Sequence, residues 1–284
     1  LHDREKHCLQ ALGTALLDSS GGCIGALVMI NDVTRIRHLE NVRREFVANV
    51  SHEIKTPLTA IKGAVEALLD GAMRDKHDLP RFLAIINKHT DRLCAIIEDI
   101  LSLSRIEQTA DGGEMPLQED FIAPALETAC SLCQERAEAK NIQLLRRCPH
   151  DLKAWINGPL LEQAVMNLID NAIKYSEEDA RVEVEAAGGA GNVIIRVTDH
   201  GCGIPAENLP RLFERFYRVD KARSRKLGGT GLGLAIVKHI VQAHRGTVEA
   251  SSVVGQGSVF TITLPGLEPS PSRLPPLPPP ESPR

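Results

Sequence analysis

The sequence predicts an α + α/β protein in which a long helical hairpin precedes a two-layer α/β sandwich. In the first part, apolar residues recur every three or four positions, as they do in amphipathic helices. After residue 116 the pattern changes to alternating helix-like and strand-like segments, over a length typical of one domain. The 284 residues suffice for about two domains, and a hydrophobic fraction of 43% predicts a packed core.

Composition narrows the classes of function. A net charge of −4 argues against a general nucleic-acid binder, and no apolar run reaches the roughly 18 residues that a membrane-spanning helix needs. The chain begins with Leu1, and we expect it to be a fragment of a longer protein. Of the seven cysteines, only Cys130 and Cys133 form a C-x-x-C pair, so we expect reduced thiols rather than a metal site.

The first elements expected are two apolar strands, residues 7–17 and 23–30, with a turn between them. Two strands alone form only a marginal hairpin, so we interpret them as the end of a larger sheet. Residues 31–34 then cap a helix that ends near Gly71.

That helix carries a histidine on its exposed side. At about 100° per residue, His52 lies about 200° from Val50 and about 160° from Ile54, which belong to the apolar seam. Glu53 is its neighbour, and Thr56 lies one turn further along. Taken alone, this pattern is typical of a capped, solvated helix face.

A second helix is expected from about Leu79, and its seam has a heptad rhythm. His89 falls on that seam, and we interpret it as a polar layer. Pro57 predicts a kink in the first helix. One hairpin cannot bury two apolar stripes, whereas two copies packed as a four-helix bundle can, so the sequence predicts a homodimer. The two seams are Phe46, Val50, Ile54, Leu58, Ile61, Val65 and Leu68, and Phe82, Ile86, His89, Leu93, Ile96, Ile100 and Leu103.

Residues 109–116 carry turn residues without periodicity and predict a linker. A proline-rich tail, 267–284, is expected to be disordered. Between them, the expected helices are 121–139, 158–175 and 231–245, and the expected strands are 142–146, 153–156, 181–187, 192–198, 247–252 and 258–264.

Polar residues stand on one face of the helix at 158–175. Asn167, Asn171 and Lys174 are four and three residues apart. Such a face is either an ordinary wet surface or a site for hydrated Mg²⁺ and the phosphates it bridges, because neutral oxygen ligands suit that ion.

Two glycine-rich segments follow. Asp199, with Gly201 and Gly203, forms either a plain turn or a carboxylate that accepts from the amino group of a flat base. Residues 227–234 lead into the helix at 231–245, where free N–H groups favour a phosphate. The basic segment before them, 211–226, is either a mobile lid over a polyphosphate or a solvated charge run.

Taken together, the order of these motifs resembles that of the sensor histidine kinases of two-component systems, and most of all the phosphate-regulon sensor kinases. The resemblance covers residues 35–266. It rests on five motifs: HEIKTP at 52–57, NLIDNAIKY at 167–175, DHGCGI at 199–204, LFERFYR at 212–218 and GTGLGL at 229–234.

The resemblance implies a role for each motif. His52 would accept the γ-phosphoryl group of ATP, with Glu53 as the base. Thr56 would orient water in the reverse, phosphatase reaction, and Arg218 would stabilise charge on the transferred group. Asn171 would ligate Mg²⁺. The residues implied in ATP binding are Asn167, Asn171, Lys174, Tyr175, Asp199, Gly201, Gly203, Gly229, Thr230, Gly231, Leu232 and Gly233.

The resemblance also implies a domain order and partners. Residues 1–34 would be the remnant of a PAS-like sensor domain, 35–108 the dimerisation and phosphotransfer domain, and 117–266 a catalytic domain of the Bergerat or GHKL type. The partners implied are a second copy and the receiver domain of a response regulator, not nucleic acid. The segment would be the cytoplasmic portion of a membrane-anchored bacterial sensor and would not contact the membrane itself.

Two departures from the family pattern, His200 and Lys55, remove no required group. Three alternatives stay open. An ATPase of the gyrase, chaperone or mismatch-repair type would lack the histidine-bearing helix. A dimerisation module that only binds nucleotide is disfavoured by Asn171 and Asp199. A kinase that works mainly as a phosphatase is not separable by sequence, because Glu53 serves both directions.

Overall fold

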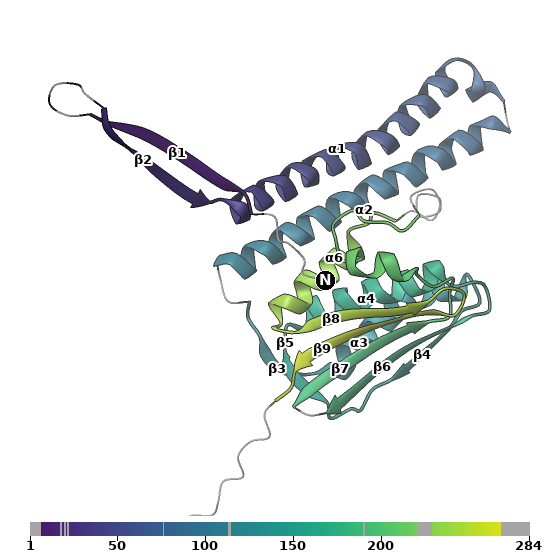
Figure 1. Ribbon diagram of the computed structural model, residues 1–284. Coiled ribbons are helices and arrows are strands. Elements are labelled where there is room, and N and C mark those ends of the chain that lie inside the picture. The colour runs from purple at the N-terminus through teal and green to yellow at the C-terminus, as the bar shows by residue number, and fades with distance from the viewer. Residues whose placement is uncertain are drawn as a thin grey trace, which may run out of the picture. The chain divides into compact units, whose positions relative to one another are not determined.

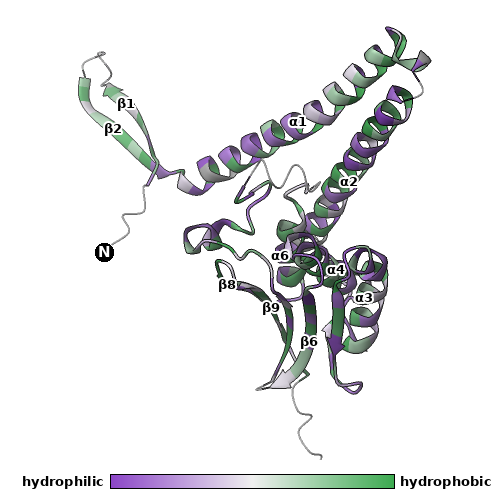
Figure 2. Ribbon diagram, turned by 90° about the vertical axis from the view of Figure 1, so that its right-hand side faces the viewer, coloured by the Kyte–Doolittle hydropathy of each residue, from purple (hydrophilic) through white to green (hydrophobic). Residues whose placement is uncertain are grey.

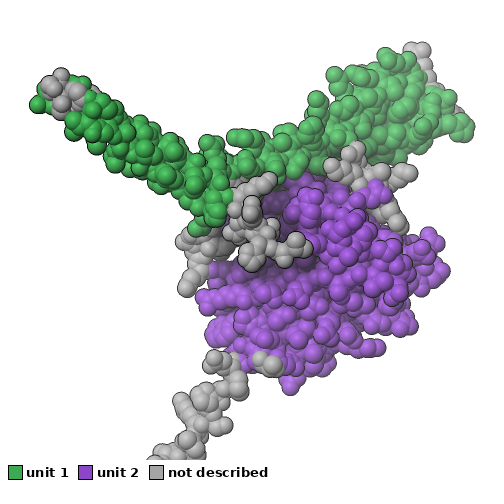
Figure 3. Space-filling model, in the orientation of Figure 1, with its two compact units in different colours: residues 1–89 green, residues 90–284 purple. Residues whose placement is uncertain are grey.

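The computed structural model describes residues 7–267, apart from 18, 20, 22, 76, 113, 114, 190 and 221–228. Figure 1 shows its elements. The distal half of the expected basic lid and residues 268–284 of the expected disordered tail therefore lie outside the described residues. The chain divides into two compact units, residues 1–89 and 90–284 (Figure 3).

The first unit begins with the expected pair of strands. β1 (Leu9–Leu17) and β2 (Cys23–Asp32) are antiparallel, with Leu9 opposite Asp32. Their apolar side chains stay exposed, and Figure 2 shows the hairpin coloured mostly as hydrophobic. The exposed large apolar residues are Leu9, Leu12, Leu16, Ile24, Leu27, Val28, Met29 and Ile30.

Helix α1 (Thr34–Leu69) follows directly. It starts where the carboxylate of Asp32 accepts the backbone N–H of Thr34 at 2.9 Å. It runs unbroken through Pro57 and ends before Gly71, whose φ of 128° suits glycine. A short 3₁₀ helix, η1 (Ala72–Arg74), leads to α2 (Asp78–Gly112).

Helix α2 extends past residue 108, where the linker was expected to begin. Residues 109–111 are compatible with a helix, so absence of periodicity placed the boundary too early. On α1, some residues of the expected apolar seam remain exposed to solvent: Leu58 is 55% exposed and Val65 is 40% exposed. An apolar stripe left on the surface is what an unpaired hairpin presents.

The second unit contains a two-layer α/β sandwich (Figure 1). The sheet has the order β4-β6-β7-β9-β8, with β4 and β6 parallel and the other neighbours antiparallel. Helices α3, α4 and α6 form the second layer. The elements are α3 (Ile122–Glu138), β4 (Gln143–Arg147), α4 (Gly158–Tyr175), β6 (Arg181–Gly189), β7 (Asn192–Asp199), η2 (Ala206–Arg211), α6 (Gly233–Ala243), β8 (Thr247–Val253) and β9 (Gly257–Pro265).

These bounds agree with the expected ones to within one or two residues at almost every end. The sequence missed β3 (Gln118–Phe121), which pairs with β5 (Lys153–Ile156), because its residues are mostly polar and do not alternate.

Helix α4 positions the polar face described below. At its start, the side chain of Asn157 accepts the backbone N–H of Leu160. At its end, Nζ of Lys140 donates to the carbonyl groups of Ile173, Lys174 and Ser176 at 2.9, 3.2 and 3.3 Å. A cation at this end complements the helix dipole.

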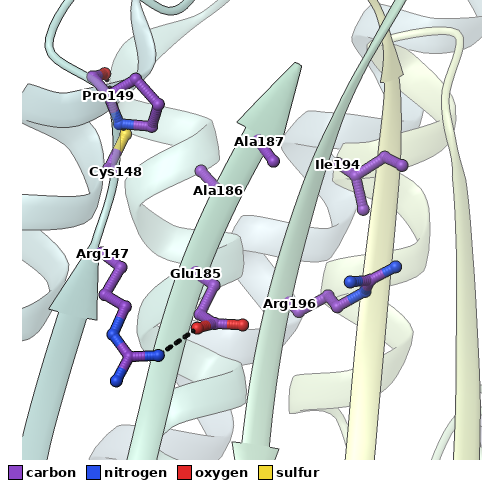
Figure 4. A pocket seen from close by; sticks show the side chains of 8 residues that line it. All are labelled: Arg147, Cys148, Pro149, Glu185, Ala186, Ala187, Ile194 and Arg196. Carbon is purple, nitrogen blue, oxygen red and sulfur yellow. Dashed lines mark hydrogen bonds and ion pairs between the residues drawn. The ribbon is translucent and has the colours of Figure 1, made fainter. Parts of the chain in front are cut away.

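The face of the sheet away from the helices carries a shallow hollow of about 520 Å³ (Figure 4). An ion pair between Arg147 and Glu185, at 2.9 Å, crosses it. The lining residues are Arg147, Cys148, Pro149, Glu185, Ala186, Ala187, Ile194 and Arg196.

Candidate nucleotide site and phospho-acceptor helix

The second unit encloses a cavity of about 430 Å³ between α4, the end of β7 and the segment that leads into α6. The structure thus brings together residues that are up to 89 positions apart in the sequence, from Asn171 to Phe260. The expected site residues on its wall are Asn171, Tyr175, Asp199, Gly203, Arg218, Gly229, Thr230 and Gly231.

Asp199 ends β7 and is only 6% exposed. One of its carboxylate oxygens accepts the backbone N–H groups of Gly201 at 2.9 Å and Ser258 at 3.2 Å. Burial raises the pKa of this carboxyl, and the two backbone hydrogen bonds act in the opposite direction. A fixed acidic group at one end of a cavity can accept a hydrogen bond from an amino group of a ligand.

The glycines around Asp199 are required by backbone packing. A Cβ on Gly201 would lie 2.4 Å from the carbonyl oxygen of Tyr175, and one on Gly203, whose φ is 68°, would lie 2.2 Å from that of Val253. Gly201 is not on the cavity wall, and its lack of a Cβ lets the loop approach α4, so its expected place beside a ligand stays a prediction.

At the other end of the cavity, Arg218 holds the glycine-rich loop. Its guanidinium donates to the carbonyl oxygen of Gly229 at 2.6 Å. Gly231, with φ of 79°, accepts the N–H of Phe216 at 2.8 Å. No side chain among the described residues caps the start of α6. An uncapped helix N-terminus beside an arginine suits a phosphate.

Lys174 and Asn167, also expected in the site, are not on the cavity wall. Burial, followed by the charge of Arg218, lowers the pKa of Lys174 to about 8. The amide nitrogen of Asn167 is buried without a partner in the described part of the chain. A Cβ on Gly233 would lie 3.8 Å from the Asn167 side chain, so this amide faces the start of α6. A buried unpartnered amide is a plausible ligand contact.

Leu232 was also expected to bind nucleotide, and this stays a prediction. Its side chain is fully buried in the core and is not on the cavity wall. Only its backbone takes part, donating to the hydroxyl of Thr230 at 3.2 Å. Helical periodicity had not shown which way this side chain points, because the residue precedes the first turn of α6.

The sequence also missed most of the apolar part of the wall. Ile204 ends the Asp199 motif and Pro205 follows it, but Val254, between β8 and β9, and Phe260, on β9, carry no local signal. A cavity that is largely apolar with a few polar groups suits a flat ring. The wall residues not singled out from sequence are Cys202, Ile204, Pro205, Leu212, Tyr217, Val219, Asp220, Leu234, Val254, Ser258 and Phe260.

The first unit presents His52 on an open face of α1. A shallow hollow there is lined by His52, Lys55, Thr56, Thr59 and Ala60. The hydroxyl of Thr56 donates to the carbonyl oxygen of His52 at 3.2 Å. The exposed direction expected for His52 is confirmed, and Thr56 lies beside it. Glu53 is half-buried and is not part of the hollow.

Two family models match the chain. Residues 42–109 match the His Kinase A (phospho-acceptor) domain, and residues 157–268 match the histidine kinase-, DNA gyrase B-, and HSP90-like ATPase. The chain therefore contains a histidine kinase phospho-acceptor domain followed by a histidine kinase-like ATPase domain. The phospho-acceptor match contains His52, and it decides against the gyrase or chaperone alternative.

The chain is similar to the sensor protein kinase WalK of Staphylococcus epidermidis strain ATCC 35984, with 40% identity over 89% of the chain and 41% of the relative. It is 38% identical to WalK of Staphylococcus aureus, over 60% of that protein. The chain thus spans about two fifths to three fifths of these relatives. The narrower likeness to phosphate-regulon sensors stays a prediction.

Solved histidine kinases share the fold. The kinase ThkA, in complex with the response regulator protein TrrA, superposes with a TM-score of 0.64 at 22% identity, over 90% of this chain and 74% of that one. Full-length ShkA in complex with AMPPNP gives a TM-score of 0.55 at 28% identity, over 78% and 46%. Within the described residues, no helix is both long and apolar enough to cross a bilayer.

Proposed function

We propose that this chain is a sensor histidine kinase that moves the γ-phosphoryl group of ATP to an imidazole nitrogen of His52 and then to an aspartate of a response regulator. The observation that carries the proposal is the exposed His52 inside the matched phospho-acceptor domain, on a chain that also encloses a nucleotide-sized cavity. In the first step a P–N bond forms as the bond from the γ-phosphorus to the β–γ bridging oxygen breaks, and ADP leaves.

Within the cavity, Asp199 recognises the adenine amino group. Its burial and its two backbone donors hold the carboxylate in one orientation. The apolar wall at Ile204 and Phe260 packs against the ring. Arg218, Lys174 and the start of α6 face the phosphates, where positive charge and free N–H groups stabilise the transferring group.

The side-chain amide oxygen of Asn171 fits a hydrated Mg²⁺, with Asn167 beside it. Asn171 is on the cavity wall, and Asn167 is a buried amide one turn away on the same helix. Neutral oxygen donors with room for water match the preference of this ion. When bound, Mg²⁺ would neutralise phosphate charge. Both amides are positioned by α4, which is capped by Asn157 at its start and by Lys140 at its end.

On α1, Glu53 takes the proton from the imidazole nitrogen that does not react, which raises the nucleophilicity of the other. Thr56 orients a water molecule in the reverse reaction, so phosphatase activity on the phosphorylated regulator accompanies the kinase activity. The hydroxyl of Thr56 is within one turn of His52, which supports this pairing.

The organisation of the full protein is also part of the proposal. Residues 1–34 are the last strands of a PAS-like domain, 35–108 dimerise and carry the phosphoryl group, and 117–266 bind ATP. The exposed seam residues Leu58 and Val65 support a homodimer through a four-helix bundle. The exposed apolar side chains of β1 and β2 support the proposal that these strands belong to a larger sheet in the full protein. Anchoring in a bacterial membrane, with this segment in the cytoplasm, completes the proposal.

Phosphotransfer to His52 is tested with γ-labelled ATP and Mg²⁺. The wild-type chain is expected to gain an acid-labile, base-stable label, and His52→Gln is expected to gain none. His77→Gln removes another exposed histidine and serves as the matched control, which should be labelled like the wild type. Label on His52→Gln, or its loss only from His77→Gln, contradicts the assignment.

A further inference from the structure

One side of α2 contacts the elements that carry the nucleotide site. The hydroxyl of Ser102 accepts a hydrogen bond from the side-chain amide of Gln163, on α4, at 2.8 Å. Five residues later, Glu107 forms an ion pair with Arg215, next to the Arg218 segment. The same carboxylate lies 3.3 Å from Nε2 of His239, on α6. These contacts hold this part of α2 in one register against the catalytic fold.

Asp99 lies on the same side of α2, one turn before Ser102. Its carboxylate accepts a hydrogen bond from the hydroxyl of Thr230. The oxygen of that hydroxyl already accepts the backbone N–H of Leu232 at 3.2 Å, so its proton is available to Asp99. Burial of Asp99 raises the pKa of its carboxyl. An acidic group from α2 therefore reaches the glycine-rich loop.

Thr230 is on the cavity wall, directly before the uncapped start of α6. A phosphate bound at this helix start would use the same hydroxyl and neighbouring N–H groups. The contact between Asp99 and Thr230 therefore takes up a donor that the ligand needs. A carboxylate beside an incoming polyphosphate also repels it, and this repulsion is strong where water is partly excluded.

We propose that Asp99 is a further residue of the nucleotide site, an acidic competitor that holds the Thr230 hydroxyl and lowers the affinity for nucleotide phosphates until they displace it. The inference rests on the proposed function, because it requires ATP to bind in this cavity. It explains why an acidic residue of α2 is half-buried against the loop. It also makes α2, which leads from the phospho-acceptor hairpin, a determinant of nucleotide affinity.

The test compares Asp99→Asn with Glu98→Gln in the full chain. Both variants remove one negative charge, but Glu98 is exposed whereas Asp99 is half-buried. Binding of a non-hydrolysable ATP analogue with Mg²⁺, and separately of adenosine, is measured by calorimetric titration. We expect Asp99→Asn to lower the Kd for the analogue about tenfold, equivalent to about 1.4 kcal/mol, with Glu98→Gln unchanged. Adenosine affinity should be equal in all three proteins.

Each other outcome has a distinct meaning. An unchanged or raised Kd for the analogue in Asp99→Asn overturns the inference and leaves the proposed function standing. Tighter binding of adenosine as well indicates general loosening of the cavity and also overturns it. If the wild type binds neither ligand, the proposed function fails, and the role of Asp99 fails with it. Asp99→Ser is a second variant in case the asparagine protein does not fold, which a thermal melt reveals.

Discussion

Lys174 should make nucleotide binding depend on pH in the alkaline range. Burial and Arg218 lower the pKa of its ammonium group to about 8, from an ordinary value of 10.5. A bound phosphate favours the charged form, so it should return the pKa toward the ordinary value. Binding at a pH above 8 must then be accompanied by proton uptake.

The size of this effect follows from the two pKa values. At pH 9 only about a tenth of the free protein carries a charged Lys174, whereas at pH 7 about nine tenths does. If the bound form stays protonated, the Kd for ATP should rise about tenfold between pH 7 and pH 9. The stability of the unliganded protein should change in the opposite sense. The unfolded chain binds more protons than the folded one between about pH 8 and 10.5, so stability rises with pH over that range.

Calorimetric titration at pH 7, 8 and 9, in pairs of buffers with different ionisation enthalpies, measures both quantities. We expect an uptake of about 0.9 proton per nucleotide at pH 9. Lys174→Met should bind more weakly at pH 7 but show a flat profile. A wild-type Kd that stays constant from pH 7 to 9, or the same slope in Lys174→Met, refutes the reasoning.

Three further predictions concern the framework of the site, each read by urea unfolding. Lys140→Met should lower the free energy of unfolding by about 2 kcal/mol, because three carbonyl groups lose a charged donor. The exposed Lys62→Met should lower it by less than about 0.5 kcal/mol. Equal losses in the two variants would contradict the role of Lys140 as a cap of α4. Gly203→Ala should cost several times the roughly 1 kcal/mol of Gly255→Ala, since both have positive φ but only the first has a carbonyl oxygen within 2.2 Å. Burial lowers the pKa of His244, so the free energy of unfolding should fall as pH drops below about 6.5. His244→Phe should make the free energy of unfolding less dependent on pH in this range. If the variant keeps the wild-type dependence, His244 is not its cause.

Much of the fold was predictable because local patterns specify it. Helix α4 has an apolar stripe, a capping asparagine and a proline at its start, and its bounds agree with the expected ones. The exposed side of α1 at His52 followed from helical geometry alone. By contrast, β3 is a short polar strand that exists only because β5 offers it hydrogen bonds, and no local pattern indicates that partner.

The candidate site was predictable in its motifs but not in its walls. Asp199 and Arg218 stand in recognisable segments, so the sequence could name them. Gly201 and Leu232 stand in the same motifs, yet one serves the backbone and the other the core. A motif identifies a loop, whereas the direction of each side chain depends on what packs against that loop.

The sequence by itself determined the order of elements, the exposed histidine on its helix and the polar face of α4, because each depends on residues within a few turns of one another. Only the tertiary structure decided the burial of Asp199, the lowered pKa of Lys174 and the contact between Asp99 and Thr230. Burial and charge proximity are set by segments that are distant in the chain. No local pattern can carry that information.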